Sequence, residues 1–302
     1  MNANKNYVAN KNHKSTVFSK LFGEDKENAL SLYNAVNGSN YTNADDLTFT
    51  TLDDVVYMKM KNDVSFLFDK TLSLYEHQST YNPNMPLRGF LYFADLYRQL
   101  IKDNERIYSK SIVKIPAPKY VVFYNGDKKD MPEEVKELYL SVAFDREVEP
   151  GKFEWTATMV NINAGMNPEL LSKCKVLGGY ATFVDKVRTY NKSMSLTDAV
   201  DQAVDECVEA VVLEEFFSKH RREVRNMVLT EFDEEKFLKM MRAEERAEGE
   251  RNVLIKILSK LGSVSKELQS QIQGIDDDTL VNWIMLASRA ESMQEFLEQI
   301  KE

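Results

Sequence analysis

The sequence predicts a mixed α/β (α+β) fold, in which helices flank a central mixed sheet and a helical segment follows at the C-terminus. Two runs of alternating apolar and polar residues surround Asp69-Lys70, which is the pattern of a β-hairpin. Apolar residues then recur at helical spacing from Leu87 to Ile101. The order helix, strands, helix, strand, strands indicates a sheet with helices on its faces.

The individual elements follow from periodicity and from capping residues. Ser15 and Asp25 are placed to cap two helices, and Asn37-Gly38 to end the second. Strands are expected at residues 47–50, on both sides of Asp69-Lys70, and at 119–124, 138–144 and 153–162. The pattern of the strand at 119–124 indicates burial on both faces. Later helices are expected at residues 195–225, 254–261, 268–275 and 280–300, with a charged helix or linker at 231–251.

These elements suggest four segments in the chain of 302 residues. We expect a disordered N-terminus, a core that carries the sheet, a helical extension with a charged linker, and a small helical C-terminal domain. Their predicted ranges are 1–13, 14–190, 191–251 and 252–302.

Charge is distributed unevenly along the chain. The net charge is −9, and residues 191–302 account for all of it, with 15 basic and 24 acidic residues. The remaining 24 basic and 24 acidic residues balance in residues 1–190, so the acidic total does not exclude a DNA partner for the core. No apolar run reaches the roughly 18 residues of a membrane span, and the polar N-terminus is unlike a secretory signal. A cytoplasmic protein is therefore expected.

The predicted hairpin brings two carboxylates together. With a two-residue turn at Asp69-Lys70, Asp63 faces Glu76, and directly opposed residues lie about 5 Å apart on the same face. Gln78 follows on that face, whereas His77 points to the other. Opposed like charges are destabilising, and a divalent cation would offset their repulsion. Two simpler readings stay open: acidic residues are common at strand ends, and a turn longer by one residue would move Asp63 out of register.

The stretch DVSFLFDKTLSLYEHQSTYNPNMPLRGFLYFADLY, residues 63–97, resembles a known family. It is similar to the recombination-promoting nuclease (Rpn-like, transposase-like) group of the PD-(D/E)XK nuclease superfamily. Asp63 stands at the first metal-binding aspartate, and Glu76-His77-Gln78 at the (D/E)-X-K motif with Gln in place of Lys. The resemblance covers nearly the whole chain and is strongest over residues 14–165.

This resemblance implies a restriction-endonuclease-like core and a magnesium-dependent endonuclease, a hydrolase of DNA phosphodiester bonds linked to recombination. Asp63, Glu76 and the backbone carbonyl of His77 would hold Mg²⁺, for which Mn²⁺ would serve as a substitute, and Gln78 would position the attacking water. Relatives often carry an acidic residue in the first helix, where this chain has Ser15. Glu24 and Asp25 are the alternative sources of a third ligand.

Four residues are candidates for DNA contacts. Lys59, Lys61 and Arg88 are placed to meet phosphates, and Tyr92 to stack on a base. Solvated edges, a surface salt bridge and core packing are the respective structural alternatives.

Two further functions remain as alternatives to an active nuclease. One is a DNA-binding or regulatory protein that keeps the nuclease fold without efficient cleavage. The other is an interaction protein that forms homo-oligomers through its C-terminal helices.

Overall fold

The computed structural model describes residues 16–50, 63–101, 107–149 and 152–300, although not the side chains of 233–245. The predicted disordered segment 1–13 and the proposed cap Ser15 lie outside these residues. The chain forms two compact units, one ending at Phe232 and the other beginning at Asp233. Helix α7 (Glu214–Leu261) contributes to both units, so the unit boundary falls within a helix and inside the predicted segment 191–251.

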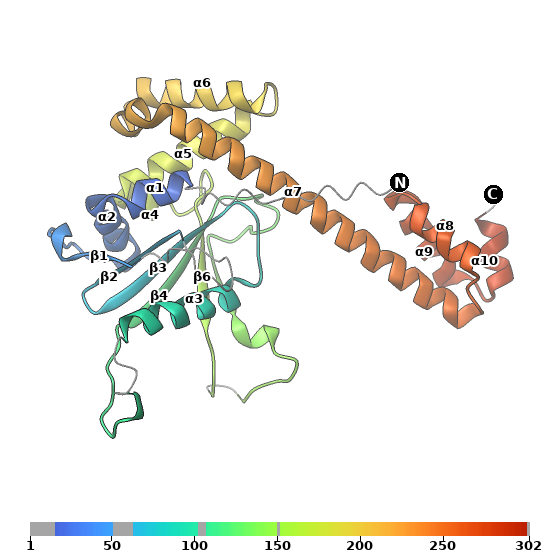
Figure 1. The fold of residues 1–302 in the computed structure, drawn as a ribbon. Helices are drawn as coiled ribbons and strands as arrows, with labels where there is room; N and C mark the ends of the chain where they lie inside the picture. Colours follow the sequence, from blue (N-terminus) through green and yellow to red (C-terminus); the bar gives the residue numbers. More distant parts are fainter. Residues whose placement is uncertain (1–15, 51–62, 102–106, 150–151, 301–302) are drawn as a thin grey trace. The chain divides into compact units, whose positions relative to one another are not determined.

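A six-stranded mixed sheet forms the centre of the first unit, which confirms the predicted α/β class (Figure 1). Its strands follow the spatial order β1-β2-β3-β4-β6-β5. The neighbours β3, β4 and β6 are parallel, whereas β1, β2 and β5 join by antiparallel pairing. The strands comprise β1 (Thr48–Phe49), β2 (Val64–Phe68), β3 (Thr71–Gln78), β4 (Ala117–Tyr124), β5 (Val135–Tyr139) and β6 (Thr156–Asn161).

The β2–β3 hairpin has the predicted register. Phe68 pairs with Thr71 and Val64 pairs with Tyr75, so the turn consists of Asp69 and Lys70 alone. Both turn residues have positive φ, at 44° and 59°, as a type I′ turn requires. The hydroxyl of Tyr41 donates a hydrogen bond to Asp69 Oδ2 at 2.6 Å, which helps to hold this turn.

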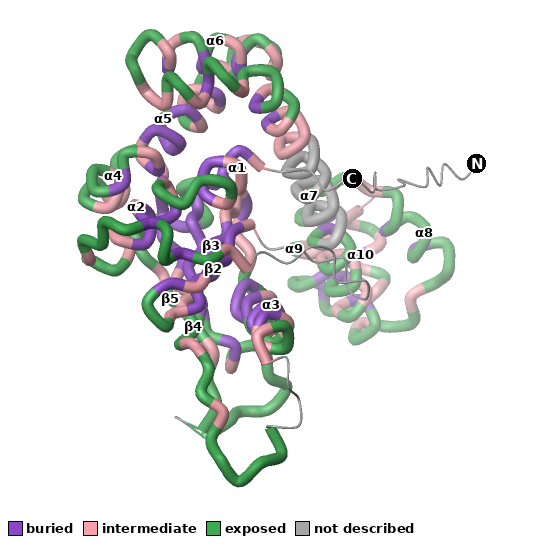
Figure 2. Tube along the Cα trace, turned by 60° about the vertical axis from the view of Figure 1, so that its left-hand side comes forward, coloured by how far each residue is buried: buried purple, intermediate pink, exposed green. Residues whose placement is uncertain are grey.

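Helices cover both faces of the sheet. On one face pack α1 (Val17–Gly23), α2 (Lys26–Asn37) and α5 (Lys175–Tyr190), and α3 (Met85–Leu100) packs on the other. The central strand β4 contributes Val121 and Phe123 to the first core and Tyr120 and Val122 to the second, so it is buried on both faces as predicted. Figure 2 shows buried residues concentrated in the sheet and in the helices that pack on it.

The helix ends show the expected capping chemistry. Thr16, one residue beyond the predicted cap, begins α1 through a reciprocal capping box with Ser19. Asp25 caps α2 by accepting the Asn28 N–H, and Gly38 ends that helix at a φ of 64°. Both features of α2 were predicted.

Three predicted elements have different bounds. The strand expected at 138–144 begins earlier, as β5, and continues as the short 3-10 helix η3 (Leu140–Ala143). The helix expected at 195–225 is divided: α6 (Leu196–Glu209), capped by Ser195, ends before a turn in which Val211 and Leu213 adopt φ values of 58° and 50°. The strand expected at 153–162 is shorter than predicted, and α4 (Pro168–Lys173) follows it.

The second unit is a small helical domain with its own core. It contains the end of α7, α8 (Lys266–Gly274), α9 (Asp277–Arg289) and α10 (Met293–Gln299). The single helix expected at 280–300 is two helices, because Ala290 is extended and Ser292 caps α10. Homo-oligomer formation through these helices stays a prediction. In the part of the chain that the structure describes, no helix combines the length and apolarity needed to cross a membrane.

The strained turn gives a testable consequence. Lys70→Gly should stabilise the protein by about 0.5–1 kcal/mol, because glycine adopts positive φ without the steric cost that a Cβ brings. Gly38→Ala, at a φ of 64° with open space around the Cβ position, should destabilise it by a similar amount. Urea unfolding followed by circular dichroism measures both variants, and destabilisation by Lys70→Gly would contradict the turn geometry.

Candidate active site

The carboxylates of Asp63 and Glu76 meet where the register places them. Asp63 directly precedes β2, and Glu76 lies near the end of β3. The His77 N–H donates a hydrogen bond to Asp63 Oδ2 at 2.8 Å. The Asp63 N–H donates to Glu76 Oε1 at 3.4 Å. Each carboxylate is therefore held by the backbone beside the other, and the predicted pairing is present in the structure.

The carboxyl group of Glu76 is buried, which is unfavourable for a negative charge. Its exposed fraction is 1%, and burial is the main cause that raises the pKa of its carboxyl group. The charge of Asp63 raises this pKa further. A buried carboxyl group beside a second carboxylate therefore either keeps its proton or pairs with a positive charge.

Arg88 provides that charge from the first turn of α3. Its Nη2 lies 3.0 Å from Glu76 Oε2, and the same nitrogen donates to the hydroxyl of Tyr92 at 3.3 Å. From the sequence, a metal is the expected compensating charge, and Arg88 is expected to contact a phosphate or to form a surface salt bridge. In the structure, Arg88 itself forms the ion pair with Glu76.

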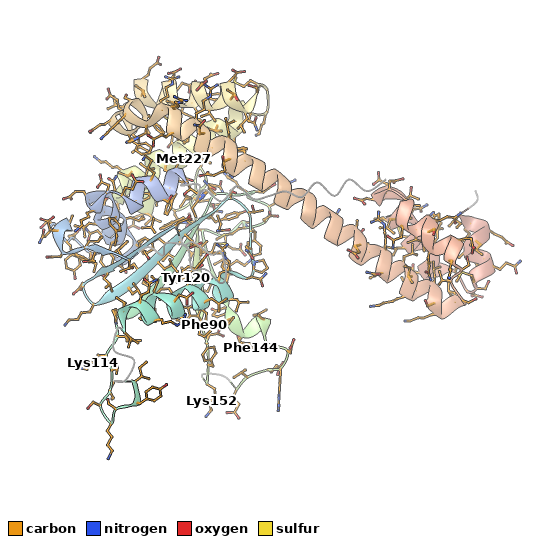
Figure 3. All side chains as sticks on the ribbon, viewed as in Figure 1. Phe90, Lys114, Tyr120, Phe144, Lys152 and Met227 are labelled. Atoms are coloured by element: carbon orange, nitrogen blue, oxygen red, sulfur yellow. The ribbon has the colours of Figure 1, made fainter. Side chains whose placement is uncertain are left out.

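The rings beside this ion pair belong to the core. Tyr92 has an exposed fraction of only 2%, so its ring presents no open face on which a DNA base could stack, contrary to its expected role. Tyr120 lies on the sheet face covered by α3 (Figure 3). Its buried hydroxyl has no hydrogen-bond partner among the described residues, and burial and the charge of Glu76 both raise its pKa.

His77 and Gln78 have different surroundings. The His77 ring is on the face opposite Glu76, where Nε2 lies 2.8 Å from Asn125 Oδ1 and 3.1 Å from the Tyr180 hydroxyl. Burial lowers its pKa to about 4, so the ring is neutral at pH 7 and serves packing, as the alternation indicated. Gln78 is half-buried, and strand alternation puts its side chain on the face of Glu76.

The remaining predicted site residues either have other partners or are not described by the structure. Lys59, Lys61 and Ser15 lie outside the described residues. Glu24 forms an ion pair with Lys20 at 3.3 Å, and the Asp25 carboxylate caps α2, so both suggested third ligands have other partners.

The donor set at this site fits a hard divalent cation. Two adjacent carboxylates offer oxygen ligands, and Mg²⁺ is commonly bound through one or two carboxylates while it keeps several waters. Among the described residues, no group of three or more His, Cys, Asp or Glu side chains is arranged to hold a metal. Asp63 and Glu76 would therefore hold the ion with waters and a substrate oxygen, and a contribution from the His77 carbonyl stays a prediction.

Arg188 is a cation near the site that sequence analysis missed. It lies on α5, and its Nη1 donates to the Gly126 carbonyl at 3.4 Å, just beyond the end of β4. Its charge helps to lower the pKa of His77, which shows that it acts on the same strand end. This proximity to the end of β3 is hidden in the sequence, since the parallel pairing of β3 with β4 and the packing of α5 on the sheet together create it.

Comparison with known proteins leaves the site to be judged by its geometry. No family model, no curated protein and no solved structure matches the chain.

The raised pKa of Glu76 predicts a pH-dependent stability. A carboxyl group with a raised pKa in the folded state binds a proton on folding, so its contribution is full at low pH and is lost as pH rises. Without divalent cations, the free energy of unfolding should fall between pH 4.5 and about pH 8. The fall should exceed that of Glu76→Gln by at least about 1.4 kcal/mol, the equivalent of one pKa unit. Urea unfolding in EDTA measures this difference, and equal pH profiles would contradict it.

Gly89 lets Tyr120 approach α3. A Cβ on Gly89 would lie 2.2 Å from Cε1 of the buried Tyr120 ring. Gly89→Ala should therefore destabilise the protein by about 1–3 kcal/mol, despite the better helix propensity of alanine. Gly249→Ala, in α7 with open space around its Cβ position, should instead stabilise by up to about 1 kcal/mol. Thermal unfolding compares the two variants, and stabilisation by both would show that the ring moves freely.

Proposed function

We propose that the protein is a metal-dependent DNA endonuclease of the PD-(D/E)XK type, with a restriction-endonuclease-like core and a link to recombination. One observation carries the proposal: Asp63 and Glu76 interlock at the hairpin, and Gln78 follows on the same face, as the D…E-X-Q pattern requires. The mixed sheet with helices on both faces is consistent with this core.

The residues of the site have separable roles in phosphodiester hydrolysis. A bound Mg²⁺ or Mn²⁺ would lower the pKa of a coordinated water and stabilise charge on the scissile phosphate. Asp63 and Glu76 hold the ion. Gln78, whose amide carries no charge and transfers no proton at neutral pH, orients the water by hydrogen bonding.

The alternative of a DNA-binding protein without efficient cleavage has one observation in its favour. Both oxygens of Glu76 already accept hydrogen bonds, from Asp63 and from Arg88. A protein in which this arrangement persisted would bind DNA without holding a catalytic ion.

A plasmid-nicking assay tests the proposal and separates it from the alternative. With Mg²⁺ or Mn²⁺ at low salt, the wild type should nick DNA, and Asp63→Ala and Glu76→Gln should each lose at least about 100-fold in rate, as expected when groups that hold the catalytic ion are removed. The control Glu137→Gln removes an exposed carboxylate on β5 and should cleave as the wild type does. DNA binding without cleavage by any variant would favour the alternative, provided that circular dichroism shows folded protein.

A further inference from the structure

The Arg88–Glu76 ion pair occupies the position that a metal ion needs. Arg88 Nη2 is 3.0 Å from Glu76 Oε2, and the other oxygen, Oε1, accepts the Asp63 N–H at 3.4 Å. Each oxygen keeps a further lone pair, but a divalent cation bound beside Oε2 would lie next to the guanidinium of Arg88, and the two positive charges would repel each other. The backbone N–H is fixed by the hairpin, whereas the guanidinium group of Arg88 is at the end of a long, flexible side chain. Arg88 is therefore the donor that can move away from Glu76.

The exposure of the two partners differs in a way that favours this exchange. The Glu76 side chain is 2% exposed, but the Arg88 side chain is 30% exposed. The carboxylate is thus enclosed, while part of the Arg88 side chain reaches solvent. An incoming phosphate can therefore meet Arg88 without entering the core.

The net charge of the site changes sign when a divalent cation binds, and this change favours the binding of a phosphate afterwards. When both carboxyl groups are ionised, Asp63, Glu76 and Arg88 together carry a net charge of −1, which attracts a divalent cation and repels a phosphate. After the cation binds, the net charge is +1, and a phosphodiester restores neutrality. Because Arg88 lies in the first turn of α3, the positive end of the helix dipole adds to the attraction for the phosphate.

We infer that Arg88 exchanges partners: it pairs with Glu76 in the metal-free protein, and it binds a DNA phosphate once a divalent cation has replaced it on Glu76. This inference rests on the proposed function. Arg88 is then both a competitor of the metal and a substrate ligand, so its removal has opposite effects on the two binding steps. A purely structural ion pair would not have this property, because its loss would loosen Glu76 and weaken both steps.

The test measures Mn²⁺ binding to the full chain without DNA, by isothermal titration calorimetry. Arg88→Gln should bind Mn²⁺ about 10-fold more tightly than the wild type, equivalent to about 1.4 kcal/mol. The same variant should lose at least 10-fold in affinity for a short duplex in the presence of Mn²⁺, measured by fluorescence anisotropy before cleavage accumulates. The control Arg98→Gln removes an exposed arginine of the same helix that pairs with Asp95, and both affinities should stay unchanged.

Two further variants make each outcome decisive. Arg88→Lys keeps a positive charge and should show a Mn²⁺ affinity between those of the wild type and Arg88→Gln, so the inference remains testable if Arg88→Gln fails to fold. Asp63→Ala should weaken Mn²⁺ binding, which shows that the titration reports this site. Wild-type binding that Asp63→Ala abolishes but neither Arg88 variant strengthens would overturn the exchange and leave the proposed function standing. Absence of Mn²⁺ binding in the wild type and in the Arg88 variants would overturn both.

Discussion

The two-residue turn between β2 and β3 is the constraint on which the site depends. Asp69 and Lys70 both adopt left-handed backbone angles, which closes the hairpin without an additional residue. Side chains alternate strictly along a strand, so a shift by one residue would turn Glu76 to the opposite face and bring the His77 ring under α3. The parallel pairing of β3 with β4 reinforces this register, since Glu76 lies beside Val122 in a strand that is buried on both faces.

The register places two carboxyl groups side by side, and the next helix, α3, provides a positive charge beside them. It places a buried carboxylate beside Asp63, and the segment that follows β3 returns within seven residues to begin α3 at Met85. Pro86 fixes the first turn of that helix, and Arg88 follows two residues later, within reach of Glu76. The short connection between β3 and α3 thus brings Arg88 close to Glu76.

The sequence was sufficient for local structure and insufficient for contacts between elements. Period-two alternation on both sides of the turn predicted the hairpin and the proximity of Asp63 to Glu76, because register within a hairpin is a local property. The partner of Arg88 was not predictable in this way, since the position of α3 over the sheet depends on packing by Tyr120 against Gly89. The end of α6 was also missed, because Val211 and Leu213 favour negative φ by their own preferences. Leu213 packs against the core, which favours its left-handed conformation, whereas Val211 is exposed.

The neutral residue at position 78 makes physical sense beside Arg88. The motif of the nuclease superfamily to which the proposed function belongs has a lysine there, on the same strand face as the acid. A lysine at 78 would add a second cation to the face that already holds Arg88. With both carboxyl groups ionised, the metal-free site would then be neutral instead of carrying a charge of −1. Because like charges in a buried environment repel strongly, that change would weaken the attraction for a divalent cation. Gln78 avoids this repulsion while it keeps a donor and an acceptor for water, so a glutamine and an arginine on adjacent elements together supply the hydrogen bonding and the positive charge that one lysine would combine.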